Sequence, residues 1–210
     1  TLLRCINRLI EPTDGQIIWN GLDITAISDE EMRLVRRRMG MIFQQFNLVK
    51  RSKVITNVLA GRLGYMSSIY SMFNYFPSQD KDDAISNLKR VGIGEQAYKR
   101  ASELSGGQQQ RVAIARALMQ HPELMLADEP VASLDPATSH SVMKYLEDLN
   151  KQDELTVICS LHFLSLARAY ADRVIALKDG KLEFDGTPDL IDNARFKEIY
   201  GEDAVEVGIN

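Results

Sequence analysis

Short apolar runs alternate along this chain with longer stretches in which apolar residues recur every three or four positions. The short runs predict strands, because four to six consecutive β-favouring residues bounded by polar turns are typical of buried strands. They are residues 16–19 (QIIW), 40–43 (GMIF), 124–128 (LMLAD), 155–160 (LTVICS) and 173–178 (RVIALK). Strands that alternate with amphipathic helices indicate an α/β protein whose sheet is covered by helices.

The chain opens directly on a helical pattern. Apolar residues within positions 2–10 recur at helical spacing, so we expect a helix there that begins at or near Thr1. Pro12, Asp14 and Gly15 then end the pattern, and Asn20-Gly21 is a hairpin signal after the first predicted strand. No capping sequence precedes this helix in the given sequence.

Residues 53–104 differ from the rest, because they combine helical periodicity and polar turns without a convincing strand. This pattern predicts a helical lobe inserted into the α/β core. Within it, residues 64–80 (GYMSSIYSMFNYFPSQD) are rich in aromatic side chains and Met. Burial inside the lobe and a contact surface for another protein both fit that composition.

Composition narrows the possible functions. The 210 residues carry 25 basic and 29 acidic side chains, so the net charge of -4 does not favour a nucleic-acid-binding surface. Cys5 and Cys159 lie far apart without a CxxC or Cys/His pattern, which indicates neither a zinc site nor a disulfide framework. No apolar stretch approaches the ~18 residues of a membrane helix, so we expect any membrane role to act through a partner.

The predicted strand 124–128 ends in two acids, Asp128 and Glu129. The carboxyl ends of strands in open α/β sheets face the crevice in which such proteins bind ligands. An aspartate there can hold Mg²⁺ through water, and a glutamate beside it can take a proton from an attacking water. An apolar strand that simply runs into a polar loop gives the same pattern. The neighbouring motifs must therefore decide between a ligand site and an ordinary loop.

A glycine-containing segment, residues 104–108 (LSGGQ), directly precedes the helical run 112–119. Open amides and the helix dipole at such a helix start suit an anion such as phosphate, although a structural helix cap has the same residues. Polar residues also follow the other predicted strands: Gln44 after 40–43, Asp135 shortly after the acidic pair, and His162 after 155–160. Their recurrence in this order makes an accidental arrangement improbable.

These motifs together resemble those of the ATPase subunit of an ATP-binding cassette transporter. LSGGQ resembles the family signature, LMLADE the Walker B strand, FQQ the Q-loop, SLD the D-loop and SLH the switch-histidine loop. The resemblance implies a P-loop NTPase (RecA-like) core of residues 1–52 and 108–210, with an α-helical subdomain of residues 53–107 that ends in the signature. In this family a helix that often reads TLLR follows the G-x-x-x-x-G-K-S/T loop. We therefore expect the N-terminal strands and that loop to precede Thr1.

The resemblance also assigns roles to individual residues. Glu129 and His162 are expected to be catalytic, with Glu129 polarising the attacking water and His162 holding the γ-phosphate. Asp128 and Gln44 are expected to bind Mg²⁺. The residues expected to bind ATP are Thr1, Gln44, Asp128, Ser105, Gly106, Gly107, Gln108 and Asp135.

The expected partners follow from the same resemblance. They are a second ATPase subunit in a head-to-tail homodimer, transmembrane permease subunits and, indirectly, a periplasmic or lipoprotein solute-binding protein, with no nucleic acid. The expected location is the cytoplasmic face of the inner or plasma membrane, held there peripherally.

Among importers, the chain most resembles the phosphonate type, through GMIFQQFNLV, VLAGRLGY, ADEPVASLDPAT and SLH. Importers of polar amino acids or methionine share much of this pattern and remain an alternative. A cassette ATPase that acts on DNA or ribosomes is a second alternative, although neither a long coiled coil nor a tandem cassette is present. The third is a non-catalytic fragment, since the given sequence contains no G-x-x-x-x-G-K-S/T motif.

Overall fold

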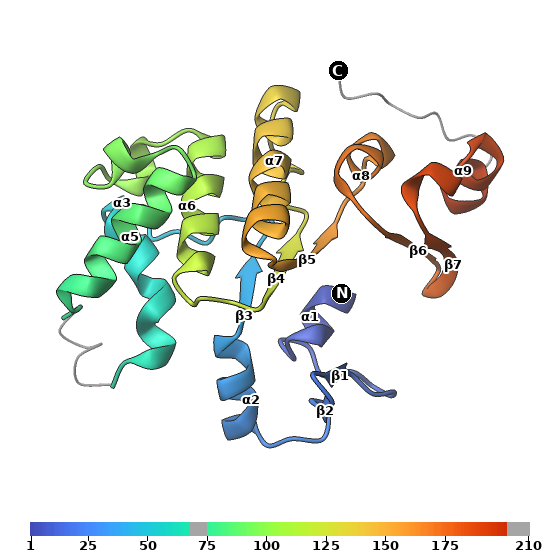
Figure 1. Cartoon of the computed structure of the whole chain (residues 1–210), viewed down its shortest axis with the longest axis horizontal. Coiled ribbons are helices and arrows are strands. Elements are labelled where there is room, and N and C mark those ends of the chain that lie inside the picture. Colours follow the sequence, from blue (N-terminus) through green and yellow to red (C-terminus); the bar gives the residue numbers. More distant parts are fainter. Residues whose placement is uncertain (68–74, 201–210) are drawn as a thin grey trace.

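A three-stranded parallel sheet forms the centre of the molecule in the computed structural model, which describes residues 1–67 and 75–200 (Figure 1). Its strands are β3 (Met39–Ile42), β4 (Leu124–Asp128) and β5 (Thr156–Ser160), in the order β3-β4-β5. The register places Asp128 opposite Ser160 at the carboxyl ends of β4 and β5. This end of the sheet carries the predicted acidic pair.

Strand β4 is buried on both faces, as expected for the central strand of a parallel sheet. Leu124 and Leu126 belong to an apolar cluster that includes residues of α1 (Leu2–Ile6) and α2 (Asp29–Arg37). Met125 and Ala127 point to the larger core, which contains α6 (Gly106–Leu118) and α7 (Pro136–Asp153). Helices therefore cover the sheet on both sides (Figure 1).

The helical lobe consists of α3 (Val54–Leu59) and α5 (Ser78–Arg90), which pack against α6, with the 3-10 turns η1 (Ala60–Tyr65), η2 (Gly94–Gln96) and η3 (Ala101–Glu103). Gly61 is required where η1 crosses α6, because a Cβ there would lie 2.1 Å from the carbonyl oxygen of Arg116. Part of the aromatic-rich segment 64–80, residues 68–74, lies outside the described residues. Within the described part Phe76 is buried, whereas Tyr65 and Tyr75 are exposed.

Two antiparallel hairpins lie away from the central sheet. The first pairs β1 (Ile18–Trp19) with β2 (Leu22–Asp23) around the predicted Asn20-Gly21 turn. The second pairs β6 (Val174–Lys178) with β7 (Lys181–Gly186). With α8 (Leu164–Tyr170), α9 (Asn193–Tyr200) and Ile191, which follows η4 (Pro188–Leu190), it encloses a small core. Across residues 1–67 and 75–200, every helix is too short or too polar to cross a membrane.

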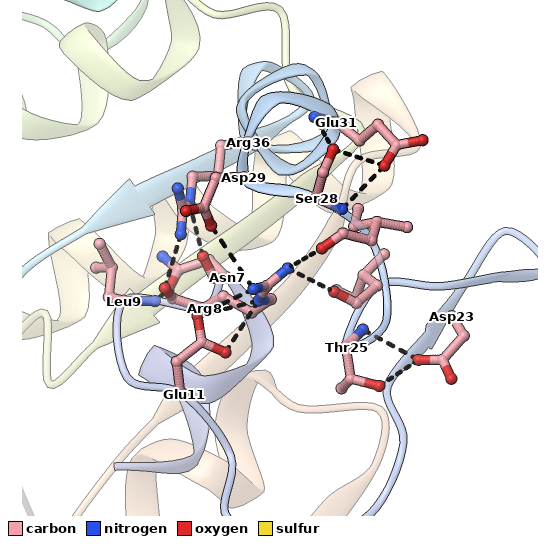
Figure 2. Close-up of polar contacts among 12 residues, drawn as sticks. Asn7, Arg8, Leu9, Glu11, Asp23, Thr25, Ser28, Asp29, Glu31 and Arg36 are labelled. Carbon is pink, nitrogen blue, oxygen red and sulfur yellow. Dashed lines mark hydrogen bonds and ion pairs between the residues drawn. The ribbon is translucent and has the colours of Figure 1, made fainter.

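The expected helix over residues 2–10 is wrong beyond Ile6, where α1 ends. Arg8 takes a left-handed backbone conformation with φ 50°, which stops the helix. Its side chain, only 9 % exposed, donates to the carbonyls of Ile24 and Ile27 and pairs with Glu11 and Asp29 (Figure 2). This cluster fixes the short α1 against the loop before α2.

Candidate active site

The two acids at the end of β4 occupy different environments. Asp128 is 9 % exposed and ends the strand. Glu129 directly follows it with φ 50°, a left-handed conformation that is uncommon for a residue other than glycine. Such backbone strain is found where the surrounding structure holds a residue in place, and it often marks a functional site.

Three loops bring polar side chains together around Glu129. Nε2 of Gln44, which follows β3, donates to Oε2 of Glu129 at 2.7 Å. Nε2 of His162, which follows β5, lies 2.7 Å from the other carboxylate oxygen, Oε1. The structure thus unites three residues that are 85 and 33 positions apart in the sequence, because all three loops leave the same end of the sheet.

Asp128 has two partners that the sequence reasoning missed. Nε of Arg4, on α1, donates to its Oδ2 at 3.1 Å. Oγ of Ser160, at the end of β5, donates to its Oδ1 at 3.2 Å and accepts a hydrogen bond of 2.9 Å from the backbone N–H of Glu129. Ser160 is polar and follows an apolar run, which is the same signal that indicated Gln44 and His162. The sequence could therefore have identified Ser160 as a candidate site residue.

The segment 105–108 forms the start of α6. Ser105 is its N-cap: its Oγ accepts from the amide of Gln108 at 3.3 Å, and Oε1 of Gln108 accepts from the amide of Ser105 at 3.0 Å. Gly106 and Gly107 form the first turn, with Ser105 and Gly106 exposed to solvent. The helix start is therefore accessible, as a site for an anion requires.

The same segment lies against the beginning of α7. A Cβ on Gly107 would lie 2.3 Å from Cγ2 of Thr138, and one on Gly106 would lie 3.7 Å from Cδ2 of Leu134. Asp135 caps α7 by accepting from the amide and hydroxyl of Thr138, at 3.0 and 2.6 Å. The hydrogen bond from the Thr138 side chain lowers the pKa of Asp135, so this carboxylate is ionised at neutral pH.

The predicted site residues thus form two groups. The first is Gln44, Asp128, Glu129 and His162, at the end of the sheet. The second is Asp135 with residues 105–108, where α6 meets α7. Thr1 is the exposed N-cap of α1, and its carbonyl accepts from the amides of Arg4 and Cys5. Within residues 1–67 and 75–200, Thr1 makes no hydrogen bond or ion pair with Asp128 or Glu129.

A further side chain connects α6 to the loop that carries Gln44. The guanidinium of Arg116 donates to the carbonyls of Asn47 and Phe46, at 2.7 and 2.9 Å. Burial lowers the pKa of Arg116, and Asn47 has a left-handed φ of 50°. Arg116 therefore holds a strained loop whose first part contacts Glu129.

The oxygen atoms at the end of the sheet are suitable ligands for a Mg²⁺ ion that binds together with a nucleotide. Asp128 and the amide oxygen of Gln44 offer the oxygen ligands that this ion prefers. Within the described residues there is no group of three or more His, Cys, Asp or Glu that could hold a metal by itself. A site of one or two carboxylates completed by phosphates needs no such group.

Comparison with known proteins decides the family. Residues 1–132, more than half of the chain, match the family model described as ABC transporter. The chain belongs to this family. Its sequence is 56 % identical over 201 residues to the phosphonates import ATP-binding protein PhnC of Shouchella clausii, a match that covers 96 % of this chain and 76 % of that protein. With PhnC of Bdellovibrio bacteriovorus it shares 55 % identity over 211 residues, a match that covers 100 % of this chain and 81 % of that protein.

A solved structure agrees with this assignment. A dimeric ATP-binding cassette in a post-hydrolysis state, bound to ADP and Pi, superimposes with a TM-score of 0.76 at 34 % identity, covering 89 % of this chain and 79 % of that one. This ABC transporter chain therefore has the mixed α/β fold of an ABC ATPase cassette.

Proposed function

We propose that this chain is the ATP-hydrolysing subunit of an ABC importer for phosphonates. The identity of 56 % and 55 % with two phosphonates import ATP-binding proteins supports the substrate class, and the match to the ABC transporter family supports the use of ATP. The observation that supports ATP hydrolysis is the position of the Glu129 carboxylate, which Gln44 and His162 hold at the end of β4.

In this proposal Glu129 is the general base. Its two oxygens are oriented by side chains from two different loops, so one position of a water beside it is preferred over others. A base in a fixed position takes the proton as the water attacks the γ-phosphate, and His162 donates a hydrogen bond to that phosphate. Phosphoryl transfer depends mainly on such positioning and on charge stabilisation.

Asp128 and Gln44 would hold Mg²⁺, which, when bound, neutralises phosphate charge. Thr1 would contact the same nucleotide. The exposed start of α6, with Ser105, Gly106, Gly107 and Gln108, would bind the ATP of a second copy in a head-to-tail homodimer, because helix amides and the helix dipole favour phosphate. Asp135, which caps the helix against which this segment packs, would lie between the two sites.

The remaining assignments follow from the same function. Residues 1–52 and 108–210 would form a RecA-like ATPase core, and residues 53–107 a helical subdomain. The subunit would work at the cytoplasmic face of the membrane on transmembrane permease subunits that receive phosphonate from a solute-binding protein, with no role for nucleic acid.

The test is ATP hydrolysis and uptake by the complete subunit, assembled with its permease and binding protein in vesicles. We expect methylphosphonate to stimulate hydrolysis, and Glu129→Gln to bind ATP while hydrolysis falls about 10²- to 10⁴-fold, as for loss of a positioned base. Glu30→Gln, at an exposed position in the first turn of α2, is the control. Hydrolysis by Glu129→Gln within about tenfold of wild type would place the base elsewhere, and stimulation by amino acids instead would refute the substrate.

A further inference from the structure

We propose that Ser160 is a positioning residue of this site, whose single hydroxyl holds both acids of β4 in their working arrangement. The proposal rests on the proposed function, since it assigns a role in the same reaction. Ser160 acts on Glu129 through the backbone amide and on Asp128 through the carboxylate.

The hydrogen-bond directions around this hydroxyl follow from its partners. The N–H of Glu129 can only donate, so the oxygen of Ser160 accepts that bond, 2.9 Å long. The hydroxyl proton is then available for Oδ1 of Asp128, 3.2 Å away, which accepts it. One hydroxyl thus satisfies both partners at once. The parallel register, in which Ser160 is the direct neighbour of Asp128, makes this possible.

The bond to Glu129 supports a strained backbone. Glu129 has φ 50°, and a non-glycine residue remains in that region only where its surroundings hold it. This conformation directs its carboxylate toward Gln44 and His162. Without the hydroxyl of Ser160, the amide of Glu129 loses its hydrogen-bond partner, and only the contacts with Gln44 and His162 then hold the carboxylate in its direction.

The bond to Asp128 selects which of its oxygens remains available. Oδ1 accepts from Ser160, whereas Oδ2 faces away from that bond and contacts Arg4 in this structure. Ser160 therefore restrains rotation of the carboxylate and leaves one defined oxygen to other groups. A hydroxyl that only completed the end of β5 would have no reason to engage both acids.

Three variants of the complete subunit test whether the hydroxyl of Ser160 positions the two acids or only stabilises the fold. Ser160→Ala removes both hydrogen bonds, and Ser160→Thr keeps the hydroxyl on a residue that suits a strand. Ser165→Ala is the matched control, because Oγ of Ser165 in α8 is buried and has no hydrogen-bond partner in the described part of the chain. We expect Ser160→Ala to lower kcat for ATP by about 10- to 10²-fold, as small misplacements of catalytic groups do, with KM for ATP changed much less. Ser160→Thr should recover most of the rate.

Hydrogen–deuterium exchange of the nucleotide-free subunit gives a readout that is independent of activity. The amide of Glu129 should exchange faster in Ser160→Ala than in wild type, and Ser165→Ala should leave it unchanged. Unchanged exchange at Glu129 would overturn the proposal. So would a Ser160→Ala variant that melts earlier but keeps the kcat of wild type, because the hydroxyl would then be only structural.

Failure of the proposed ATPase function can be distinguished from failure of the proposal for Ser160. If the wild-type subunit does not hydrolyse ATP, the catalytic role of Ser160 fails together with the assigned reaction. The exchange comparison still decides whether Ser160 holds the backbone of Glu129.

Discussion

Gly107 and Thr138 are in such close contact that a Cβ on Gly107 would lie 2.3 Å from Cγ2 of Thr138. Thr138 cannot rotate away freely, because its hydroxyl donates to Oδ2 of Asp135 at 2.6 Å and its amide donates to Oδ1. The first turn of α6 and the cap of α7 are therefore one packed unit. Any side chain at position 107 must disturb both.

We predict that Gly107→Ala lowers the free energy of unfolding by about 1–3 kcal/mol, the usual cost of overpacking. Gly106→Ala is the control: the nearest atom to its Cβ would be 3.7 Å away, and alanine has the better helix propensity, so stability should stay level or rise. Urea denaturation of both variants measures the difference. Thr138→Ser keeps the hydroxyl that donates to Asp135 but lacks Cγ2, so it should recover most of the loss in the double mutant. Strictly additive effects of the two substitutions would contradict this explanation.

Replacement of His162 should affect turnover more than binding. Its imidazole contacts Glu129 and is proposed to hold the γ-phosphate as charge develops. We predict that His162→Asn in the complete subunit lowers kcat at least about 10²-fold, with only a modest loss of ATP affinity, because its contact is made mainly in the transition state.

His121→Asn is the matched control for that measurement. His121 lies between α6 and β4, away from Glu129, and has φ 49°, a conformation that asparagine tolerates. Steady-state hydrolysis and equilibrium nucleotide binding give the two quantities. Equal losses of rate and affinity in His162→Asn, or the same loss in His121→Asn, would indicate a folding role for the histidine.

Sequence patterns placed Gln44, Glu129 and His162 at or just after the ends of predicted strands, and their gathering then follows from simple geometry. Parallel strands end at one edge of a sheet, so residues just after apolar runs meet there. The position of LSGGQ at a helix start was equally accessible, since Ser105 and Gln108 have the spacing of a capping box. These inferences required only strand direction and local spacing.

The features that the sequence did not predict depend on backbone conformations, strand register and long-range contacts, none of which can be read from residue types. Arg8, Asn47 and Glu129 all have φ 50° without being glycine, and the left-handed conformation of Arg8 shortened the first helix. The hydrogen bonds of Ser160 with both acids depend on its register with Asp128. The contact of Arg116 with the Gln44 loop joins segments 69 and 70 residues apart, a distance over which no local pattern operates.

Cys159, the neighbour of Ser160 on β5, has an unusual thiol. Burial, with a smaller contribution from the negative charge of Asp128, raises its pKa to about 12. In the unfolded chain this thiol titrates at its ordinary value, near 8.5. As the pH rises above that value the unfolded state loses a proton that the folded state keeps, so unfolding becomes more favourable between the two pKa values.

The same pKa predicts that native Cys159 is almost inert toward alkylation, because the thiolate is the reacting form. At pH 8 a thiol with a pKa near 8.5 is roughly a quarter ionised, whereas one near 12 is ionised to about one part in 10⁴. We therefore expect iodoacetamide to modify Cys159 at least about a hundredfold more slowly in the folded subunit than in urea, measured in a Cys5→Ser background that leaves a single thiol among residues 1–210. Native Cys5, with Cys159→Ala, is the control and should react much faster, since it is only partly buried and lies in the five-residue helix α1. Rapid modification of Cys159 in the folded state would show that β5 opens to solvent, and the hold of Ser160 on the two acids would then be transient as well.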